Sequence, residues 1–384
     1  MKILTINTDS NAGGSTQSLL LSLEGLKNTG HEILAITARQ GYFTDALDAL
    51  GIAHVEESFL SINVWPKLSN LKNIVLVLPR FLFQRLKQIV SYYRLTKIIK
   101  QNRPDLIHTN NSLTTVGYRL SKKFHIPHLW HIREYGQKDF GFHRFPTEAI
   151  FKHRLKQSKF VTITKALASY YGDSDCRNVI YNGIGVNSSS EIKPENKNKW
   201  FLYVGSISKE KGFSDLLYAF AEYKSKNKGT GYKLIVLGSP ISDYMRPLNK
   251  LIKELDLHNN VIFKGQVENV SYYMQKSRAT IVPSIYEAFG RITAEAMLNK
   301  CLVIGRNTAG TKEQFDNGVE IFKREIGLRF NSVLELVDRL YEAENMSLEH
   351  YYDITNKAYK TAMELYSVSQ HQKALINFIE SFNE

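Results

Sequence analysis

The feature that most constrains the fold of this chain is an alternation of short apolar strands with helical sequence. The alternation runs through the first half and then starts again. In the first half, the predicted strands are residues 2–7, 31–37, 105–110, 127–132 and 159–164. The first helix is predicted at 15–30, with Ser15 as its N-cap and Gly30 as its stop. Strands that are apolar throughout and alternate with helices are typical of parallel sheets covered on both faces.

The second series of strands follows a polar segment, SSSEIKPENKNK at residues 188–199, whose charges and proline indicate a linker. Its predicted strands are residues 200–205, 232–238, 260–265, 279–284 and 301–305. Only helical sequence follows residue 331, and the last amphipathic helix has no strand of its own to cover. We therefore expect an α/β fold of two doubly wound, Rossmann-like domains, at residues 1–190 and 197–366.

The length of 384 residues agrees with two domains, because single cores rarely grow that large. The two cysteines, Cys176 and Cys301, lie far apart, so we expect no disulfide framework, no cysteine metal site and a cytoplasmic location. The first apolar run is too short for a signal peptide. Pro79 and Arg80 interrupt the best candidate for a membrane span, so we expect the chain not to cross a bilayer.

Positive charge is concentrated in the first half of the chain. Residues 1–190 hold 24 Lys and Arg against 13 Asp and Glu, or +11, whereas residues 191–384 hold 26 against 24, or +2. No acidic residue occurs between Glu57 and Asp105. An asymmetry of this kind indicates an anionic partner for the first half.

The acid-free segment contains a long helical pattern at about 71–102, for which we predict a break at Pro79. Within the acid-free residues 58–104, Arg and Lys alternate with aromatic residues such as Trp65 and Phe83. We expect the basic residues 65–103 to bind an anionic membrane surface. An ordinary basic helix face is the alternative.

The loops after the predicted strands are where chemistry is expected, because ligands of open parallel sheets bind beyond the carboxyl ends of the strands. After the first strand, TDSNAGG brings Gly13 and Gly14 to a helix start, which favours an anion. The segment LWHIREYG places His131 at a strand end, where it could bind a substrate hydroxyl or a phosphate. A plain connection and a packed histidine are the alternatives. The dinucleotide-binding pattern G-x-G-x-x-G is absent from the first loop.

A loop in the second half, YVGSISKEKG, joins a strand to a helix through Gly205, Ser206, Lys209, Lys211 and Gly212. A lysine beside a helix N-terminus is unfavourable unless a polyanion lies between them. The segment therefore indicates a polyanion, and a solvated lysine on a turn is the alternative.

The loop PSIYEAFGRITAEAM puts Glu287 and Glu295 eight positions apart, on either side of a predicted helix start. A diphosphate at this turn would be held by backbone amides. Glu295 would then bind a vicinal diol such as a ribose, and Glu287 the hydroxyls of a sugar. The residues expected to contact the ligand at the turn are Phe289, Gly290, Arg291, Ile292 and Thr293. The alternative is one capping glutamate and one surface glutamate.

Taken together, these segments resemble those of retaining glycosyltransferases of family 4. The resemblance covers nearly the whole chain and includes VIYNGI and NTAGTKEQFDNG. Its most specific element is the pair of glutamates in the setting EAFGRITAEAM. It implies the GT-B architecture, in which two Rossmann-like domains face a cleft and the last helix, at 367–384, returns to the first domain.

The resemblance also implies roles for the candidate residues. Glu287 would contact the donor sugar, Glu295 the ribose, and Lys211 the diphosphate. His131 would contact the transferred sugar, so that the catalytic set is His131, Lys211 and Glu287. Further donor contacts would come from Gly14, Gly205, Ser206, Gly265 and Val267, the last two at the base pocket. Ser206 stands where the family often has Arg, and Arg291 or Lys209 would then replace that charge.

The implied reaction transfers a sugar with retention from a nucleotide-diphosphate sugar to an acceptor hydroxyl. The acceptor would be a saccharide, which we expect to be lipid-linked and part of bacterial surface polysaccharide assembly. The enzyme would lie peripherally on the inner face of the plasma membrane. We expect no metal and no further cofactor, because Lys211 and a helix N-terminus can stabilise the leaving diphosphate. The Asp173-x-Asp175 pattern is only a weak candidate for a metal site.

Two other functions would explain part of the sequence. A nucleotide-sugar epimerase of the same fold would use the same kind of donor, although no acid–base residues for it stand out. A non-catalytic polyanion or nucleic-acid binder would explain the positive charge but would leave the two glutamates without a role. We therefore expect no nucleic-acid partner.

Overall fold

A computed structural model describes residues 1–60, 62–65, 77–173, 175–185, 192–240 and 244–382. These residues form two compact units. The N-terminal unit contains residues 1–183 together with 368–384, and the C-terminal unit contains residues 184–367. Each unit is built around one parallel sheet, so the predicted α/β architecture of two doubly wound sheets is confirmed.

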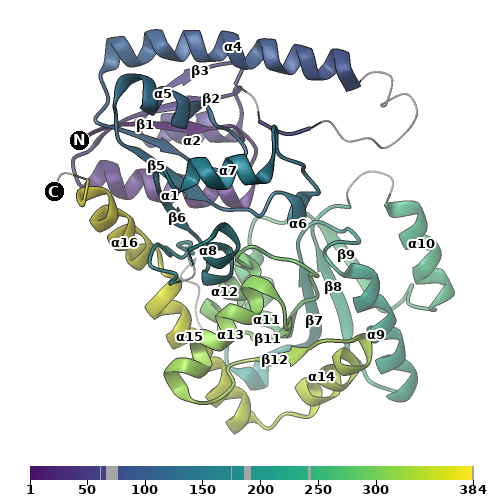
Figure 1. Ribbon diagram of the computed structural model, residues 1–384. Helices are drawn as coiled ribbons and strands as arrows, with labels where there is room; N and C mark the ends of the chain where they lie inside the picture. The colour runs from purple at the N-terminus through teal and green to yellow at the C-terminus, as the bar shows by residue number, and fades with distance from the viewer. Residues whose placement is uncertain (61, 66–76, 174, 186–191, 241–243, 383–384) are drawn as a thin grey trace. The chain divides into compact units, whose positions relative to one another are not determined.

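The sheet of the N-terminal unit has six parallel strands in the order β3-β2-β1-β4-β5-β6 (Figure 1). The strands are β1 (Lys2–Asn7), β2 (Glu32–Thr37), β3 (Ala53–Glu56), β4 (Leu106–Thr109), β5 (His128–Ile132) and β6 (Lys159–Thr162). The helices are α1 (Gly14–Asn28), α2 (Tyr42–Ala49), α4 (Val77–Asn102), α5 (Val116–Phe124), α6 (Gln137–Phe140), α7 (Glu148–Leu155), α8 (Lys165–Tyr171) and α16 (Val368–Glu380).

Two apolar clusters cover the two faces of this sheet. On one face, α1, α2 and α16 pack onto the strands through residues such as Leu23, Phe43 and Leu375. On the other face, α4 and α5 pack through residues such as Leu95 and Leu120. Helix α16 lies beside α1 (Figure 1), so the last helix of the chain belongs to the N-terminal unit.

The sheet of the C-terminal unit also has six parallel strands, in the order β12-β11-β10-β7-β8-β9. They are β7 (Asn198–Val204), β8 (Lys233–Leu237), β9 (Val261–Gly265), β10 (Ser277–Val282), β11 (Leu302–Arg306) and β12 (Leu328–Phe330). The helices are η1 (Pro194–Asn196), α9 (Phe213–Lys226), α10 (Met245–Glu254), α11 (Val270–Lys276), α12 (Arg291–Leu298), α13 (Ala309–Phe322), α14 (Val333–Asn345) and α15 (Leu348–Tyr366). Strands β7, β10 and β11 are neighbours, so the loops that follow them open at the same edge of the sheet.

The structure corrects several local predictions. Helix α1 begins at Gly14 with Gly13 as its N-cap, so Ser15 lies inside the helix and does not cap it. Helix α4 is not broken at Pro79, because this proline lies in the first turn, where its missing N–H would have no partner. The predicted start of this helix, at residues 71–76, lies outside the described residues.

Two strands were not predicted from the sequence, and the start of a third differs from its prediction. Strands β3 and β12 have only four and three residues and lie at the edges of their sheets, so each is too short for a strand pattern to stand out in the sequence. Strand β7 begins at Asn198, inside the segment predicted as a linker. None of the helices in the described part of the chain combines the length and the hydropathy that a bilayer-spanning helix needs.

Candidate functional site

The candidate site of the C-terminal unit begins where the β7–α9 loop meets the β10–α12 loop. Gly212 ends the first loop with φ +67°, and a Cβ atom there would lie 2.0 Å from the carbonyl oxygen of Pro283. Only glycine permits this approach. The amide of Ile285 also donates a hydrogen bond of 3.1 Å to the carbonyl oxygen of Glu210. The two loops are therefore held against each other by their backbones.

This contact brings Lys211 to Glu287. The Nζ atom of Lys211 lies 2.6 Å from Oε1 of Glu287, and the hydroxyl of Ser284 donates to the same oxygen at 2.9 Å. Both side chains of the ion pair are partly exposed. The backbone of Glu287 is fixed as well, because its carbonyl oxygen accepts a hydrogen bond from the amide of Gly310. The structure thus joins two of the predicted catalytic residues, Lys211 and Glu287, in one pair.

Helix α12 starts beside this pair, and a glycine sets its first turn. Gly290 is the N-cap, with φ +82°, and neither a side-chain cap nor an acidic residue in the first turn occupies the helix start. The side-chain amide of Gln314 donates to the carbonyl oxygens of Phe289 and Gly290, at 2.6 and 3.1 Å. These bonds fix the turn from the interior. A helix start of this kind favours an anion.

The second glutamate lies one turn into α12. Nη2 of Arg291 lies 3.3 Å from Oε1 of Glu295, and both side chains are partly buried. Burial raises the pKa of the Glu295 carboxyl, and the neighbouring guanidinium of Arg291 opposes this shift. Ile292 is also partly buried, whereas the Thr293 side chain is fully buried and bonded to Thr311. Each of the two predicted glutamates therefore has a cation of its own beside the start of α12.

The remaining predicted residues of the C-terminal unit lie on loops at the same edge of the sheet. Gly205 follows β7, and its carbonyl oxygen would lie 2.0 Å from a Cβ atom at Gly238, which follows β8. Gly238 donates its amide to Gly265, at the end of β9. The carbonyl oxygen of Ser206 accepts a hydrogen bond from the hydroxyl of Tyr203. Val267 follows Gly265 and is partly buried.

The two predicted residues of the N-terminal unit differ in exposure. Gly14 is partly exposed as the first residue of α1. His131 is fully buried in β5, where its ring lies 5.8 Å from that of His108 and 6.3 Å from that of His371, measured between centroids. Burial and the nearby Arg133 lower the pKa of His131, so its imidazole is neutral. Its predicted contact with a sugar stays a prediction.

Ser284 and Gln314 are structural supports that the sequence analysis missed. Ser284 holds the carboxylate of Glu287, and Gln314 holds the turn at Gly290 from α13. Nothing in the sequence around either residue predicts this role, because the group that each one bonds is brought near only when the loops pack together. In the N-terminal unit, the guanidinium of Arg133 donates hydrogen bonds to the side-chain oxygens of Asn110 and Asn182.

The weak candidate for a metal site is engaged in other contacts. Asp175 pairs with Arg177 at 2.6 Å, and Asp173 accepts a hydrogen bond from the amide of Asn178. Within the described ranges, no group of three or more His, Cys, Asp and Glu side chains is arranged to hold a metal ion.

Comparison with known solved structures identifies the fold. The structure matches that of HepE from Anabaena in complex with UDP, with a TM-score of 0.76 and 19% identity over 99% of this chain and 100% of that one. It also matches the lipopolysaccharide outer core galactosyltransferase WaaB, with a TM-score of 0.70 and 18% identity over 99% of each chain. At such identities the likeness shows a shared fold.

Several known sequences related to the chain are named glycosyltransferases. It is 24% identical to an uncharacterized glycosyltransferase of Methanocaldococcus jannaschii, over 92% of this chain and 90% of that protein. It is 28% identical to the O-antigen chain mannosyltransferase RfbU of Salmonella typhimurium, over 50% of this chain and 55% of that protein. A third relative is the N-acetylgalactosamine-N,N'-diacetylbacillosaminyl-diphospho-undecaprenol 4-alpha-N-acetylgalactosaminyltransferase of Campylobacter jejuni, which is 30% identical over 36% of this chain and 37% of its own length.

Sequence profiles of two families match the chain one after the other. Residues 12–187 match the profile of glycosyltransferase family 4, and residues 187–361 match that of the glycosyl transferases group 1. The chain is therefore a glycosyltransferase of the GT-B type, with a family 4 domain followed by a group 1 domain.

Proposed function

We propose that the enzyme transfers a sugar, with retention, from a nucleotide-diphosphate sugar to an acceptor hydroxyl. The observation that carries the proposal is the pair of carboxylates beside the start of α12, each with its own cation: Glu287 with Lys211, and Glu295 with Arg291. Cations at a helix start are unfavourable on their own. An anionic ligand between them would turn this arrangement into a favourable one.

A nucleotide sugar fits this arrangement in its charge and in its hydroxyl groups. Its diphosphate would meet the amides at the start of α12, and its hydroxyls would meet carboxylates, which accept hydrogen bonds from diols. In this proposal Glu295 binds the ribose and Glu287 the transferred sugar. The solved structure of HepE from Anabaena in complex with UDP-glucose, which shares the fold, supports this class of donor.

The chemistry of the proposed reaction is mainly the stabilisation of a leaving diphosphate. Negative charge grows on the diphosphate as its bond to the sugar breaks, and the ammonium of Lys211 together with the start of α12 would stabilise this charge without a metal ion. We assign the retained configuration to attack by the acceptor on the same face, assisted by a departing phosphate oxygen. The neutral imidazole of His131 would orient the sugar and would not act as a base.

The acceptor that we propose is a lipid-linked saccharide in the assembly of a bacterial surface polysaccharide. The names of two relatives support it, since one acts on O-antigen chains and the other on a saccharide linked to diphospho-undecaprenol. Such an acceptor would place the enzyme at the inner face of the plasma membrane, as a peripheral protein.

A donor screen tests the proposal. The protein is incubated with a panel of UDP- and GDP-sugars, with and without EDTA, and both nucleoside diphosphate release and the thermal midpoint are measured. We expect one donor to raise the midpoint and to be hydrolysed slowly, with EDTA having no effect. Glu287→Gln and Glu295→Gln should remove both responses, whereas Glu349→Gln, an exposed glutamate of α15, should keep them.

Three outcomes would contradict the proposal. Conversion of the donor to an epimer, detected by NMR without release of the nucleotide, would favour an epimerase. Tight, salt-sensitive binding of nucleic acid with no response to any donor would favour a polyanion binder. Loss of activity in EDTA that Mg²⁺ restores would refute the role given to Lys211 and the helix start.

A further inference from the structure

The outward face of α4 carries a continuous row of large apolar side chains. Leu78, Leu82, Leu86, Ile89 and Tyr93, here called the outer stripe, are each between 46% and 66% exposed. Their spacing of three or four residues places them on one face of the helix. Contiguous exposed apolar side chains of this kind mark a site of interaction.

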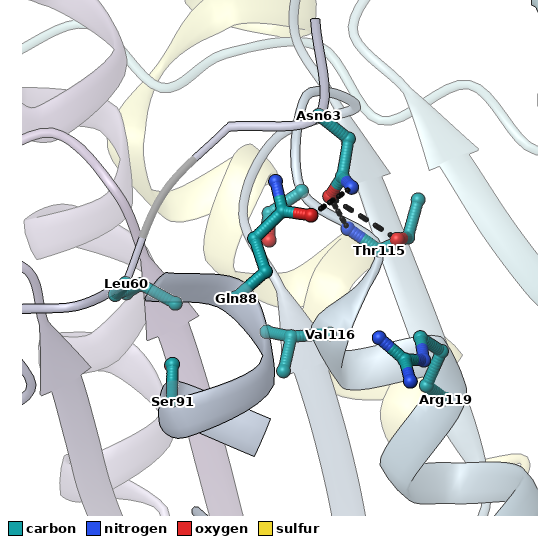
Figure 2. A pocket seen from close by; sticks show the side chains of 8 residues that line it. Leu60, Asn63, Gln88, Ser91, Thr115, Val116 and Arg119 are labelled. Carbon is teal, nitrogen blue, oxygen red and sulfur yellow. Dashed lines mark hydrogen bonds between the residues drawn. The ribbon is translucent and has the colours of Figure 1, made fainter. Parts of the chain in front are cut away.

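The opposite face of α4 packs into the core of the N-terminal unit, whereas the outer stripe lies outside that core. Leu95 and Ile99 are buried against the sheet and α5. Figure 2 shows the polar part of this contact, in which Asn63 joins Gln88 of α4 to Thr115 at the start of α5. The hydrogen bond from Asn63 to Gln88 is 3.1 Å long, and the one from the Thr115 amide to Asn63 is 3.0 Å long.

The cavity between these residues is too small for a substrate. It leaves about 10 Å³ for water, which is the space of a single molecule. Its walls include Ser91 of α4 and Arg119 of α5 (Figure 2). The inner face of α4 is thus closely packed against the sheet and α5. The helix carries a second apolar face, the outer stripe, which is exposed.

Basic residues border and extend the outer stripe. Lys97 and Lys100 continue it, four and seven residues beyond Tyr93, and both are exposed. Arg80 is exposed in the first turn of α4, and the partly exposed Trp65 stacks on Phe81 beside it, with 4.8 Å between the ring centroids. No acidic residue occurs from residue 58 to residue 104. Tryptophan, tyrosine and basic residues around an apolar stripe are typical of helices that lie in a membrane interface.

We propose that the outer stripe and the lysines that continue it dock the enzyme on a bilayer that contains anionic lipids. The apolar side chains would enter the boundary between headgroups and acyl chains, and the basic side chains would contact anionic headgroups. The charge disfavours a second copy of the chain as the occupant, since pairing two outer stripes would bring two acid-free basic segments together. The inference goes beyond the transfer reaction, because binding to vesicles needs neither donor nor acceptor.

Cosedimentation of the full chain with vesicles tests this inference. One set of vesicles contains 30% phosphatidylglycerol in phosphatidylcholine, and the other contains phosphatidylcholine alone. We expect binding to the first set, weakening with salt, and at least tenfold weaker binding to the second. The charge variant Arg80→Gln/Lys97→Gln/Lys100→Gln should bind the anionic vesicles roughly 100-fold less, because each basic residue at such a surface contributes about fivefold.

The stripe variant Leu82→Gln/Leu86→Gln/Ile89→Gln should also lose most of its binding. Its fold is checked by circular dichroism and the thermal midpoint, which should stay as in the wild type because these side chains are outside the core. The matched controls carry the same changes on exposed residues of the C-terminal unit. They are Arg246→Gln/Lys250→Gln/Lys253→Gln and Ile321→Gln/Leu334→Gln/Leu348→Gln, and both should bind like the wild type.

Equal binding to both sets of vesicles, or unchanged binding by the folded charge and stripe variants, would overturn the inference. So would a dimer in equilibrium sedimentation that the stripe variant converts to a monomer while neither protein binds vesicles. The donor screen is read separately, so failure of the docking surface and failure of the proposed reaction are distinguishable.

Discussion

The ammonium of Lys211 lies 2.6 Å from a carboxylate oxygen of Glu287, although 76 residues separate them in the chain. The contact exists because β7 and β10 are paired in the sheet, so that the loops that follow them lie side by side and are joined by a backbone hydrogen bond. It keeps a cation and a carboxylate together at the start of α12. The arrangement is therefore held by contacts within the C-terminal unit itself.

The ammonium of Lys211 should matter far more for turnover than for stability. Lys211→Gln should lower kcat roughly 100- to 1,000-fold, as expected for loss of a group that stabilises charge in the transition state. The thermal midpoint should change little, because a partly exposed ion pair contributes about 0–1 kcal/mol. Lys228→Gln is the control. A variant that keeps wild-type kcat would exclude Lys211 from the chemistry.

Arg291, and not Lys209, should supply the charge that Ser206 lacks. Arg291 begins α12 and already pairs with Glu295, whereas Lys209 is exposed on its loop. We expect Arg291→Gln to raise the donor KM about tenfold, which corresponds to the loss of one charge-assisted hydrogen bond. Lys209→Gln should leave KM within about twofold of the wild type, a difference that steady-state kinetics resolves. The reverse pattern would assign the charge to Lys209.

Gly212 should be intolerant of any side chain. Gly212→Ala would place a Cβ atom 2.0 Å from the carbonyl oxygen of Pro283 and would strain a backbone with φ +67°. We expect a loss of roughly 3 kcal/mol or more in the free energy of unfolding of the C-terminal unit, measured by urea denaturation. Gly229→Ala separates the two causes, since φ is +100° there but nothing lies within 4 Å. This control should cost about 1–2 kcal/mol.

The N-terminal unit should lose stability in mild acid because it buries neutral histidines. Burial lowers the pKa of His108 and of His128 from the ordinary 6.5 to about 3, and lowers that of His131 as well. Between these values and 6.5 the unfolded chain binds more protons than the folded one. The stability that each buried neutral histidine contributes is therefore complete above about pH 6.5. Well below that pH it is lost at about 1.4 kcal/mol per pH unit for each histidine.

Urea denaturation from pH 7.5 to pH 5.5 checks this expectation. In a Trp200→Phe background, the fluorescence of Trp65 and Trp130 reports on the N-terminal unit alone. His108→Leu should reduce the total change in stability between pH 7.5 and pH 5.5 by about 1.4 kcal/mol, whatever its effect at pH 7.5, because the unfolded histidine takes up most of its proton within this window. His258→Asn, at an exposed site of the C-terminal unit, should not change the slope. A slope near zero in the parent protein would mean that the folded chain binds as many protons as the unfolded chain, so that burial does not lower the pKa of these histidines.

Part of the candidate site could be predicted from the sequence because it is local in the chain. Glu287, Gly290 and Glu295 belong to one loop and the helix that follows it, so their spacing alone places two carboxylates around a helix start. The supports of that turn could not be predicted. Ser284 and Gln314 resemble ordinary loop and helix residues until the loops pack together.

The sequence by itself determined that the chain forms two parallel sheets covered by helices, because the periods of strands and helices are local properties of the chain. It also determined where the acid-free basic segment lies. Only the tertiary structure decided that Lys211 reaches Glu287, that the ring of His131 lies near those of His108 and His371, and that one apolar face of α4 remains exposed. The physical reason is that burial and pairing depend on which distant elements pack against a residue, and its neighbours in the chain do not specify that.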